Sequence, residues 1–298
     1  MLHCGVFSFE VLGTGSLGST PSILAISDNE RLLFDCGDGT QRLCTEYGAR
    51  VSKISRVYLT RNEPHANGGL GGFLLTRSDL PAGGKTSVVG PPGLGRIVRS
   101  YRHFYNRPGC LVSAFEIGCE QFPFATADGV HVEPVMVGGP DRTSSGHAEK
   151  RSRRTSPSEV SRGFEVYESD FSIPGPSDLA FAASYILSLP ERRGKFHPEK
   201  AAKLGVKPGP DYGKLTRGIA ITLPDGRIVS PKDCMDQAEP PPMAAIVWCP
   251  SVSHLVQLSE HDAMRKLQSE HAKQVNCVLH VSPPVSYTHL TLPTKRIV

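Results

Sequence analysis

The sequence predicts a loop-rich α/β protein, and three observations carry this prediction. Short apolar segments with strand periodicity alternate with three segments that begin and end like helices. Hydrophobic residues make up 39% of the 298 positions, yet no apolar run approaches the roughly 18 residues needed to cross a bilayer. The 30 glycines and 25 prolines follow no period of three, which excludes a collagen-like fibre. We therefore expect a globular protein with no membrane partner.

Strands are predicted where apolar residues alternate with polar ones or form short unbroken runs. Phe7, Phe9 and Val11 alternate with polar residues, which is typical of a half-buried strand. A turn signal over 27–30 joins the two runs that follow into a hairpin. The further predicted strands cover 22–27, 31–36, 54–60, 86–89, 179–189, 244–248 and 275–281.

Helices are predicted from their start and stop signals. Residues 39–47 form a short helix that ends at Gly48, in the position just past a helix where glycine is favoured. Pro91 and Pro92 open a helix towards Tyr105. Ser259 and Asp262 form a capping box for a helix that runs to about Ala272.

Two segments are expected to lie outside the folded domain. Residues 138–163 contain no Leu, Ile, Phe, Tyr or Trp, so they bury too little apolar surface to offset their ordering entropy, and we predict disorder. Residues 285–298 lack any periodicity and resemble a translated sequencing-adapter junction, so we interpret them as a non-native tail. We therefore expect one domain over 1–284, with 138–163 as a disordered insert within it.

The cysteines indicate a reducing compartment. None of the eight forms a CxxC pair, and the N-terminus runs almost directly into strand-like sequence without a signal peptide. We expect reduced thiols in an intracellular protein whose natural chain starts upstream of Met1.

Two loops near the N-terminus contain motifs with a possible ligand-binding role. Gly13–Gly18 matches G-x-G-x-x-G, but a dinucleotide site needs a helix next, and the sequence after Pro21 favours a hairpin. Asp35, Cys36 and Asp38 follow a predicted strand, as a metal or phosphate site would require. A turn in which Asp38 caps the next helix explains the same residues and is favoured.

Residues 60–72 (TRNEPHANGGLGG) resemble the signature region of the metallo-β-lactamase superfamily. Its hydrolases carry His-x-His-x-Asp-His before a Gly-Leu pair, and these side chains hold two zinc ions. The resemblance implies an α/β (α+β) fold, an αββα sandwich. Counted back from Gly69, the ligand positions fall on residues that cannot supply that site, namely Arg61, Glu63, His65 and Ala66.

Residues 196–229 resemble the flexible arm of ribonuclease Z, the endonuclease that trims the 3′ trailer of precursor tRNA. The matching elements are Pro198–Ala201, Leu204–Val206, Pro208–Pro210, Tyr212–Leu215 and Asp225–Arg227. In that family the arm protrudes and grips tRNA, so the resemblance implies a flexible arm over 191–230. The expected RNA-binding residues are Arg192, Arg193, Lys195, Lys200, Lys203, Lys207, Gly209, Pro210, Tyr212, Lys214 and Arg217.

The charge distribution agrees with an RNA-binding arm. Eight cations and three acids between Glu191 and Arg217 give this segment a net charge of +5, whereas the other 271 residues sum to −1. A concentrated basic excess is the electrostatic signature of contact with a phosphate backbone. Gly209 and Pro210 are expected at the tip, with Tyr212 as a stacking face.

Further ligand positions also depart from the family pattern. Pro250 follows Cys249 where ribonuclease Z has Gly-Asp, and 135–139 contain no histidine where the family places one. This pattern resembles the N-terminal half of long-form ribonuclease Z, which has lost its zinc ligands and keeps the arm. The resemblance implies no catalytic residue and no metal in this chain. Its partners would be precursor tRNA and a zinc-dependent catalytic half, in the nucleus or the mitochondrion.

Two other functions remain open from the sequence. A free-standing metal-dependent hydrolase would draw its ligands from His65, Asp35, Asp38 and Glu63. A pure docking module would bind a homologous catalytic half without touching RNA.

Overall fold

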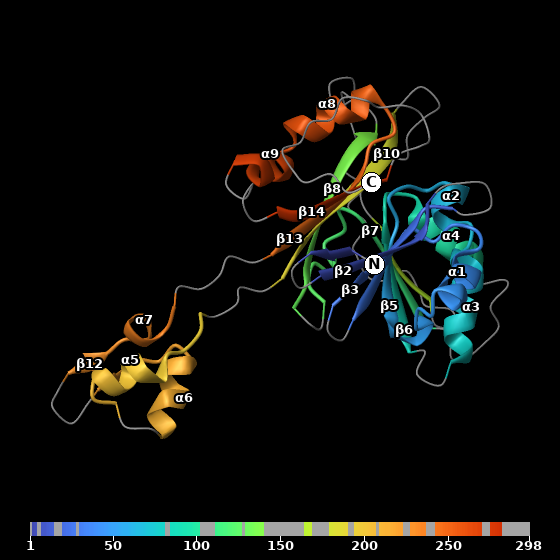
Figure 1. The fold of residues 1–298 in the computed structure, drawn as a ribbon. Helices are drawn as coiled ribbons and strands as arrows, with labels where there is room; N and C mark the ends of the chain where they lie inside the picture. Colours follow the sequence, from blue (N-terminus) through green and yellow to red (C-terminus); the bar gives the residue numbers. More distant parts are fainter. Residues whose placement is uncertain are drawn as a thin grey trace. The chain divides into compact units, whose positions relative to one another are not determined.

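The computed structural model describes residues 2–4, 7–14, 20–27, 30–80, 84–101, 111–126, 129–139, 164–168, 179–189, 194–206, 209–222, 227–236, 242–269 and 275–281. The chain divides into two compact units. Unit 1 comprises Met1–Ser188 and Met243–Val298, and unit 2 comprises Leu189–Pro242. Figure 1 shows the helices and strands of each unit.

An eight-stranded sheet forms the first layer of unit 1, in the order β1-β2-β3-β4-β5-β6-β7-β9. The strands β1 to β4 pair antiparallel, as short hairpin loops require, and β4 to β9 pair parallel. The bounds are β1 Leu2–Cys4, β2 Phe7–Gly13, β3 Ser22–Ile26, β4 Arg31–Phe34, β5 Ile54–Tyr58, β6 Lys85–Gly90, β7 Leu111–Glu116 and β9 Phe164–Tyr167.

Helices cover one face of this sheet and form a core with it (Figure 1). They lie in the connections between the parallel strands, which need crossovers of this kind. Leu43, Phe73 and Val98 on the helices pack with Leu33 and Val88 on the strands. The helices are α1 Thr40–Glu46, the 3-10 helix η1 Val51–Lys53, α2 Pro64–Asn67, α3 Leu70–Asp79 and α4 Leu94–Tyr101.

A four-stranded sheet, ordered β14-β13-β10-β8, packs against the other face. Three aromatic rings join the sheets: Tyr185 lies 5.2 Å from Tyr58 and 5.6 Å from Phe34, measured between ring centroids. Helices α8 and α9 lie beyond the second sheet, which completes an αββα sandwich and confirms the predicted fold class (Figure 1). The bounds are β8 His131–Gly139, β10 Leu179–Ser188, β13 Met243–Trp248, β14 Val275–Val281, α8 Val252–Glu260 and α9 Asp262–Ser269.

The described residues of unit 2 form three short helices and a two-stranded ribbon. Helices α5 and α6 each begin with proline and end two residues before a glycine with positive φ, Gly205 or Gly218. The core residues are Ala201, Val206, Leu215, Ile221, Val229 and Cys234. The bounds are α5 Pro198–Lys203, α6 Pro210–Thr216, α7 Pro231–Cys234, β11 Ile221–Thr222 and β12 Ile228–Val229.

Some expectations about elements need correction. Ser259 does not start a helix: it lies in α8, where its hydroxyl donates to the Val256 carbonyl, and the next helix begins at Asp262. Asp38 is exposed and precedes Gly39, the N-cap of α1, whereas the Thr40 hydroxyl donates to the Gly37 carbonyl. The predicted disordered segment also starts too early, because Gly138 and Gly139 belong to β8.

Three further predictions concern the two segments expected outside the folded domain, the Gly13 loop and membrane-spanning helices. Residues 140–163 and 285–298 lie outside the described part of the chain. The Gly13 loop leads into β3, which pairs antiparallel with β2, so a strand stands where a dinucleotide site needs a helix. No described helix is long and apolar enough to span a membrane.

Candidate functional site

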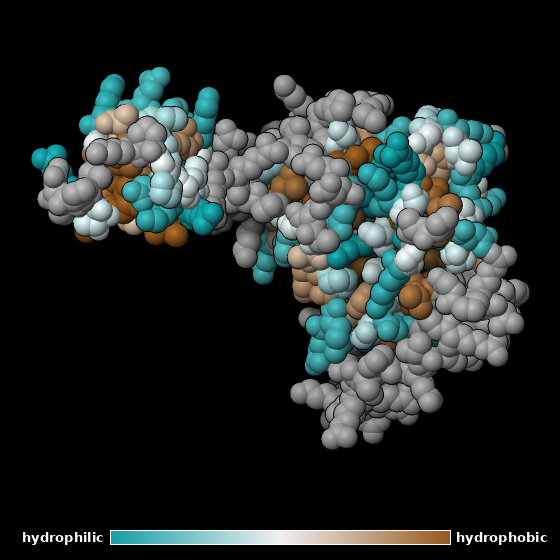
Figure 2. Space-filling model, turned by 90° about the horizontal axis from the view of Figure 1, so that it is seen from below, coloured by the Kyte–Doolittle hydropathy of each residue, from teal (hydrophilic) through white to brown (hydrophobic). Residues whose placement is uncertain are grey.

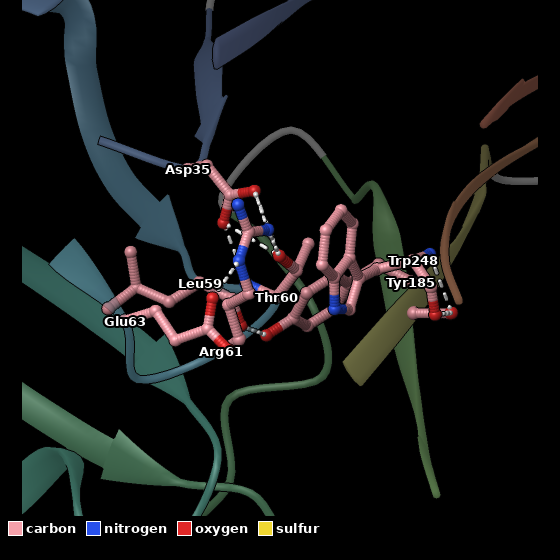
Figure 3. A network of polar contacts seen from close by, with 8 residues as sticks. Asp35, Leu59, Thr60, Arg61, Glu63, Tyr185 and Trp248 are labelled. Carbon is pink, nitrogen blue, oxygen red and sulfur yellow. Dashed lines mark hydrogen bonds and ion pairs between the residues drawn. The ribbon is translucent and has the colours of Figure 1, made fainter. Parts of the chain in front are cut away.

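A buried polar network stands where the sequence resemblance places a metal centre (Figure 3). Asp35 follows β4 and is 1% exposed, with an unusual left-handed backbone (φ 59°). Its Oδ1 accepts a hydrogen bond from the Thr60 backbone N–H at 2.8 Å, and its Oδ2 accepts one from the Thr60 hydroxyl at 2.8 Å. The carboxylate is therefore held by the residue that follows Leu59, just past the end of β5.

Arg61 lies at the centre of the network, 4% exposed. Its Nη1 lies 3.4 Å from Asp35 Oδ2 and donates to the Thr60 hydroxyl oxygen at 3.0 Å. Its Nε donates to Glu63 Oε2 at 3.1 Å. The guanidinium carbon lies 3.7 Å from the centroid of the Trp248 ring, a cation–π contact with the second sheet (Figure 3).

Close backbone contacts bring the two loops of the network together. Cys36 N–H donates to the Ala66 carbonyl at 2.6 Å, and Gly69 N–H donates to the Cys36 carbonyl at 3.0 Å. A Cβ on Gly69 would lie 2.1 Å from the Gly37 carbonyl oxygen. Glycine at 69 is therefore required by packing, which gives the Gly-Leu pair of the sequence signature a structural role.

The electrostatics of this network are dominated by burial. Desolvation raises the pKa of Asp35 to about 6, although Arg61 and the hydrogen bonds from Thr60 oppose the shift. Burial also raises the pKa of the Cys36 thiol, which favours its neutral form.

The residues at the ligand positions do not fit a zinc site. Arg61 brings a permanent positive charge, and Glu63 bonds to that charge. His65 is exposed on α2, Ala66 has no donor atom, and Pro250 follows β13 without one. Among the described residues, no three His, Cys, Asp or Glu side chains are grouped closely enough to hold a metal ion. The four proposed hydrolase ligands, His65, Asp35, Asp38 and Glu63, are not brought together as such a group.

Most of the expected RNA-binding residues lie exposed on unit 2, whereas Arg192, Arg193 and Lys207 are outside the described residues. Figure 2 shows hydrophilic side chains projecting from this unit beside hydrophobic residues. Gly209 is the N-cap of α6 and Pro210 its first residue, so these two start a helix. The exposed residues are Lys195, Lys200, Lys203, Gly209, Pro210, Lys214 and Arg217.

Acids within unit 2 bind part of this positive charge. Lys214 Nζ lies 2.8 Å from Asp211 Oδ1, and Lys200 Nζ lies 3.5 Å from Asp236 Oδ1. His197 Nε2 contacts the other oxygen of Asp236 at 2.6 Å, which lowers the pKa of that carboxyl. Sequence reasoning missed His197 and Asp236, because 39 residues separate them and no local pattern joins them.

Tyr212 has contacts within unit 2. The ring is half-buried and packs edge-on against Phe196, with centroids 5.1 Å apart. The hydroxyl donates weakly to the carbonyls of Pro198 and Val206, at 3.4 and 3.3 Å. Tyr212 therefore joins α5 to α6, and its role as a stacking face for a base stays a prediction.

Comparisons with known proteins find similarity to tRNase Z proteins. A family model described as tRNase Z endonuclease matches residues 10–69. The chain is 30% identical over 284 residues to "tRNAse Z TRZ4, mitochondrial" of Arabidopsis thaliana, 29% identical to "Ribonuclease Z, mitochondrial" of Drosophila melanogaster, and 25% identical to "Zinc phosphodiesterase ELAC protein 2" of Homo sapiens. These matches cover 92–94% of this chain but only 29–34% of the relatives.

A solved structure supports the fold. The chain superposes on a long form RNase Z from yeast with a TM-score of 0.57 at 16% identity, covering 93% of this chain and 32% of that one. The superposition shows that this chain and that part of the yeast protein share one fold. The chain thus spans about a third of the length of the proteins that it resembles along nearly its whole extent.

Proposed function

We propose, from the similarity to ribonuclease Z along more than nine-tenths of the chain, that this protein takes part in tRNA 3′-end processing as the non-catalytic, tRNA-binding N-terminal half of a long form. The observation that carries the proposal is the coverage: a nearly complete match to this chain accounts for only about a third of each relative. A catalytic half of the same kind of protein is the corresponding partner.

The ligand positions support the non-catalytic part of the proposal. Arg61 and its partners fill the place where the fold holds metal ions, and the described residues offer no alternative group of ligands. Cleavage of a phosphodiester by a metal-bound hydroxide requires such ligands. Zinc would therefore belong to the catalytic partner half, and this chain alone would not cleave RNA.

Unit 2 supplies the surface for RNA binding. Lys203 and Arg217 are exposed, and no ion pair joins either to an acid within the described residues, so their charge is available to phosphates. Lys200 and Lys214 would exchange their bonds to Asp236 and Asp211 for phosphate contacts. The mitochondrial names of the plant and fly relatives make the mitochondrion the proposed compartment, and the family resemblance leaves the nucleus as the other.

Charge reversal on unit 2 tests RNA binding. We expect Lys203→Glu/Arg217→Glu to weaken binding of a trailer-containing precursor tRNA by at least about tenfold at 100 mM salt. We also expect it to reduce the slope of log Kd against log salt by about 2, because each lost phosphate contact contributes about 0.9. Fluorescence anisotropy with labelled precursor tRNA over 50–300 mM KCl measures both quantities.

A matched control separates a site from overall charge. Lys53→Glu/Arg96→Glu makes the same change in net charge at two exposed residues of unit 1. Equal weakening by both double variants would remove the role of unit 2, and unchanged binding by both would favour the docking module. Trailer cleavage by the wild-type chain with added zinc would instead favour the free-standing hydrolase.

A further inference from the structure

The network around Arg61 connects parts of unit 1 that the backbone does not join directly. Asp35 follows β4, and Arg61 and Glu63 follow β5; both strands belong to the first sheet. Trp248 is the last residue of β13 in the second sheet. The guanidinium donates to carboxylates on one side and faces the indole ring on the other (Figure 3).

Neighbouring hydrogen bonds hold the same loop against the second sheet. The Tyr185 hydroxyl donates to the Leu59 carbonyl at 2.6 Å, and Ala183 N–H donates to the Thr60 carbonyl at 2.8 Å. Trp248 N–H donates to the Ser184 hydroxyl oxygen at 3.1 Å, which fixes the start of the indole side chain. The carbonyl groups of the two residues before Arg61 are thus both bonded to β10, so the position of its guanidinium is closely determined.

A buried carboxylate needs a compensating charge or a proton. Asp35 is nearly inaccessible to water, and Arg61 is the cation within reach of it among the described residues. An isolated buried carboxylate costs several kcal/mol, and the usual compensation is a paired cation with further hydrogen bonds. Arg61 and Thr60 supply both.

We propose that Arg61 is a built-in cation that takes the structural place of a metal at this site. It couples the two sheets by bonding Asp35 on one and stacking on Trp248 of the other, and it makes the folding of unit 1 independent of divalent cations. The proposal does not rest on the tRNA-binding function. It assigns to a residue at a lost ligand position a role in the stability of the fold.

The chemistry favours arginine over lysine at this position. A planar guanidinium donates from two nitrogens to two different carboxylates while its face lies on an aromatic ring, and a lysine ammonium has no such face. Arg61 uses all of these features, since Nη1, Nε and the plane each have a separate partner.

The single tryptophan of the chain makes the proposal directly testable. Because Trp248 is the only tryptophan, intrinsic emission reports on the indole that contacts Arg61. We expect Arg61→Met to change this emission spectrum and to lower the thermal midpoint of unit 1 by about 5–15 °C, since it leaves Asp35 buried without its cation. Arg42→Met, the same substitution at an exposed arginine paired with Glu46, should shift the midpoint by less than about 2 °C.

Metal addition and removal test the second part of the proposal. With the wild-type chain, neither EDTA nor one equivalent of ZnCl₂ should change the midpoint or the Trp248 emission. A zinc-dependent rise in the midpoint together with a change in emission would overturn the proposal, as would a midpoint for Arg61→Met equal to that of Arg42→Met. If Arg61→Met does not fold, Arg61→Lys decides: an unchanged midpoint contradicts the proposal, and a loss of several degrees supports it.

Discussion

Ionisation of Asp35 should make the stability of the protein depend on pH. Burial raises the pKa of this carboxyl from 3.8 to about 6 in the folded state. A raised pKa means that the folded state holds the proton more tightly than the unfolded state does. The stabilisation is complete below pH 4 and is lost as the pH rises through 6.

The variant Asp35→Asn removes this titration and keeps the shape of the side chain. Asparagine also tolerates the left-handed backbone at this position (φ 59°). We expect the free energy of unfolding of the wild type, relative to Asp35→Asn, to fall by about 2.5 kcal/mol between pH 4 and 8. Urea unfolding followed by Trp248 emission measures it, and Asp38→Asn shows the effect of losing an exposed carboxylate nearby. A difference that does not change with pH would contradict the expected sign.

Sequence reasoning at this scale found the right segments but assigned their side chains incompletely. It placed Asp35 and Asp38 at a strand end and expected Asp38 to cap a helix. The acid with the structural role is Asp35, which bonds to residues 25 and 26 positions away. Contacts of that range depend on how β4 and β5 pair, so no pattern in the local sequence identifies them.

At the scale of a helix, two glycines of unit 2 should respond in opposite ways to the same substitution. Gly213 lies inside α6 and Gly218 just after it, and an added Cβ would contact nothing within 4 Å at either position. Gly218 has a φ of 85°, and the N–H groups of Gly218 and Ile219 donate to the carbonyls of Leu215 and Lys214. This is the glycine-terminated helix end in which a positive φ closes the last turn.

We therefore expect Gly213→Ala to stabilise unit 2 by about 0.5–1 kcal/mol, because alanine loses less backbone entropy in a helix. Gly218→Ala should destabilise it by about 1 kcal/mol, because alanine is strained at that φ. Hydrogen exchange of the α6 amides measures both changes. Equal effects at the two positions would show that backbone conformation does not determine stability here.

The elements that sequence reasoning recovered are those with a local signal. The β3–β4 hairpin, α1 with its terminal glycine, and the apolar strands β10, β13 and β14 were all predicted within a few residues. Helix α3 was missed because Gly71 and Gly72 lower its intrinsic helix propensity. It forms because Leu70, Phe73 and Leu74 pack into the core, a tertiary contribution that the local sequence does not contain.

At the scale of the whole molecule, the net charge of unit 2 is smaller than the net charge of its basic segment 191–217. The segment 191–217 carries +5. The rest of the unit adds two cations and four acids, so the net charge of 189–242 is +3; these residues are Arg227, Lys232, Asp225, Asp233, Asp236 and Glu239. Asp236 pairs with Lys200 and His197. The sequence predicted the concentration of charge, but only the fold identifies which cations are neutralised within the unit.

The two units should lose their structure at different concentrations of denaturant. Among the described residues, the helix-side core of unit 1 contains 19 buried residues and that of unit 2 contains six. The hydrophobic core of a unit as small as unit 2 rarely stabilises the folded state by more than about 3–5 kcal/mol. We expect the amides of α5 and α6 to exchange at urea concentrations well below the transition that Trp248 emission reports for unit 1. Gly213→Ala should raise the urea concentration at which the α5 and α6 amides exchange and leave the Trp248 transition unchanged. If the two transitions coincide in both the wild type and Gly213→Ala, the chain unfolds as one cooperative unit.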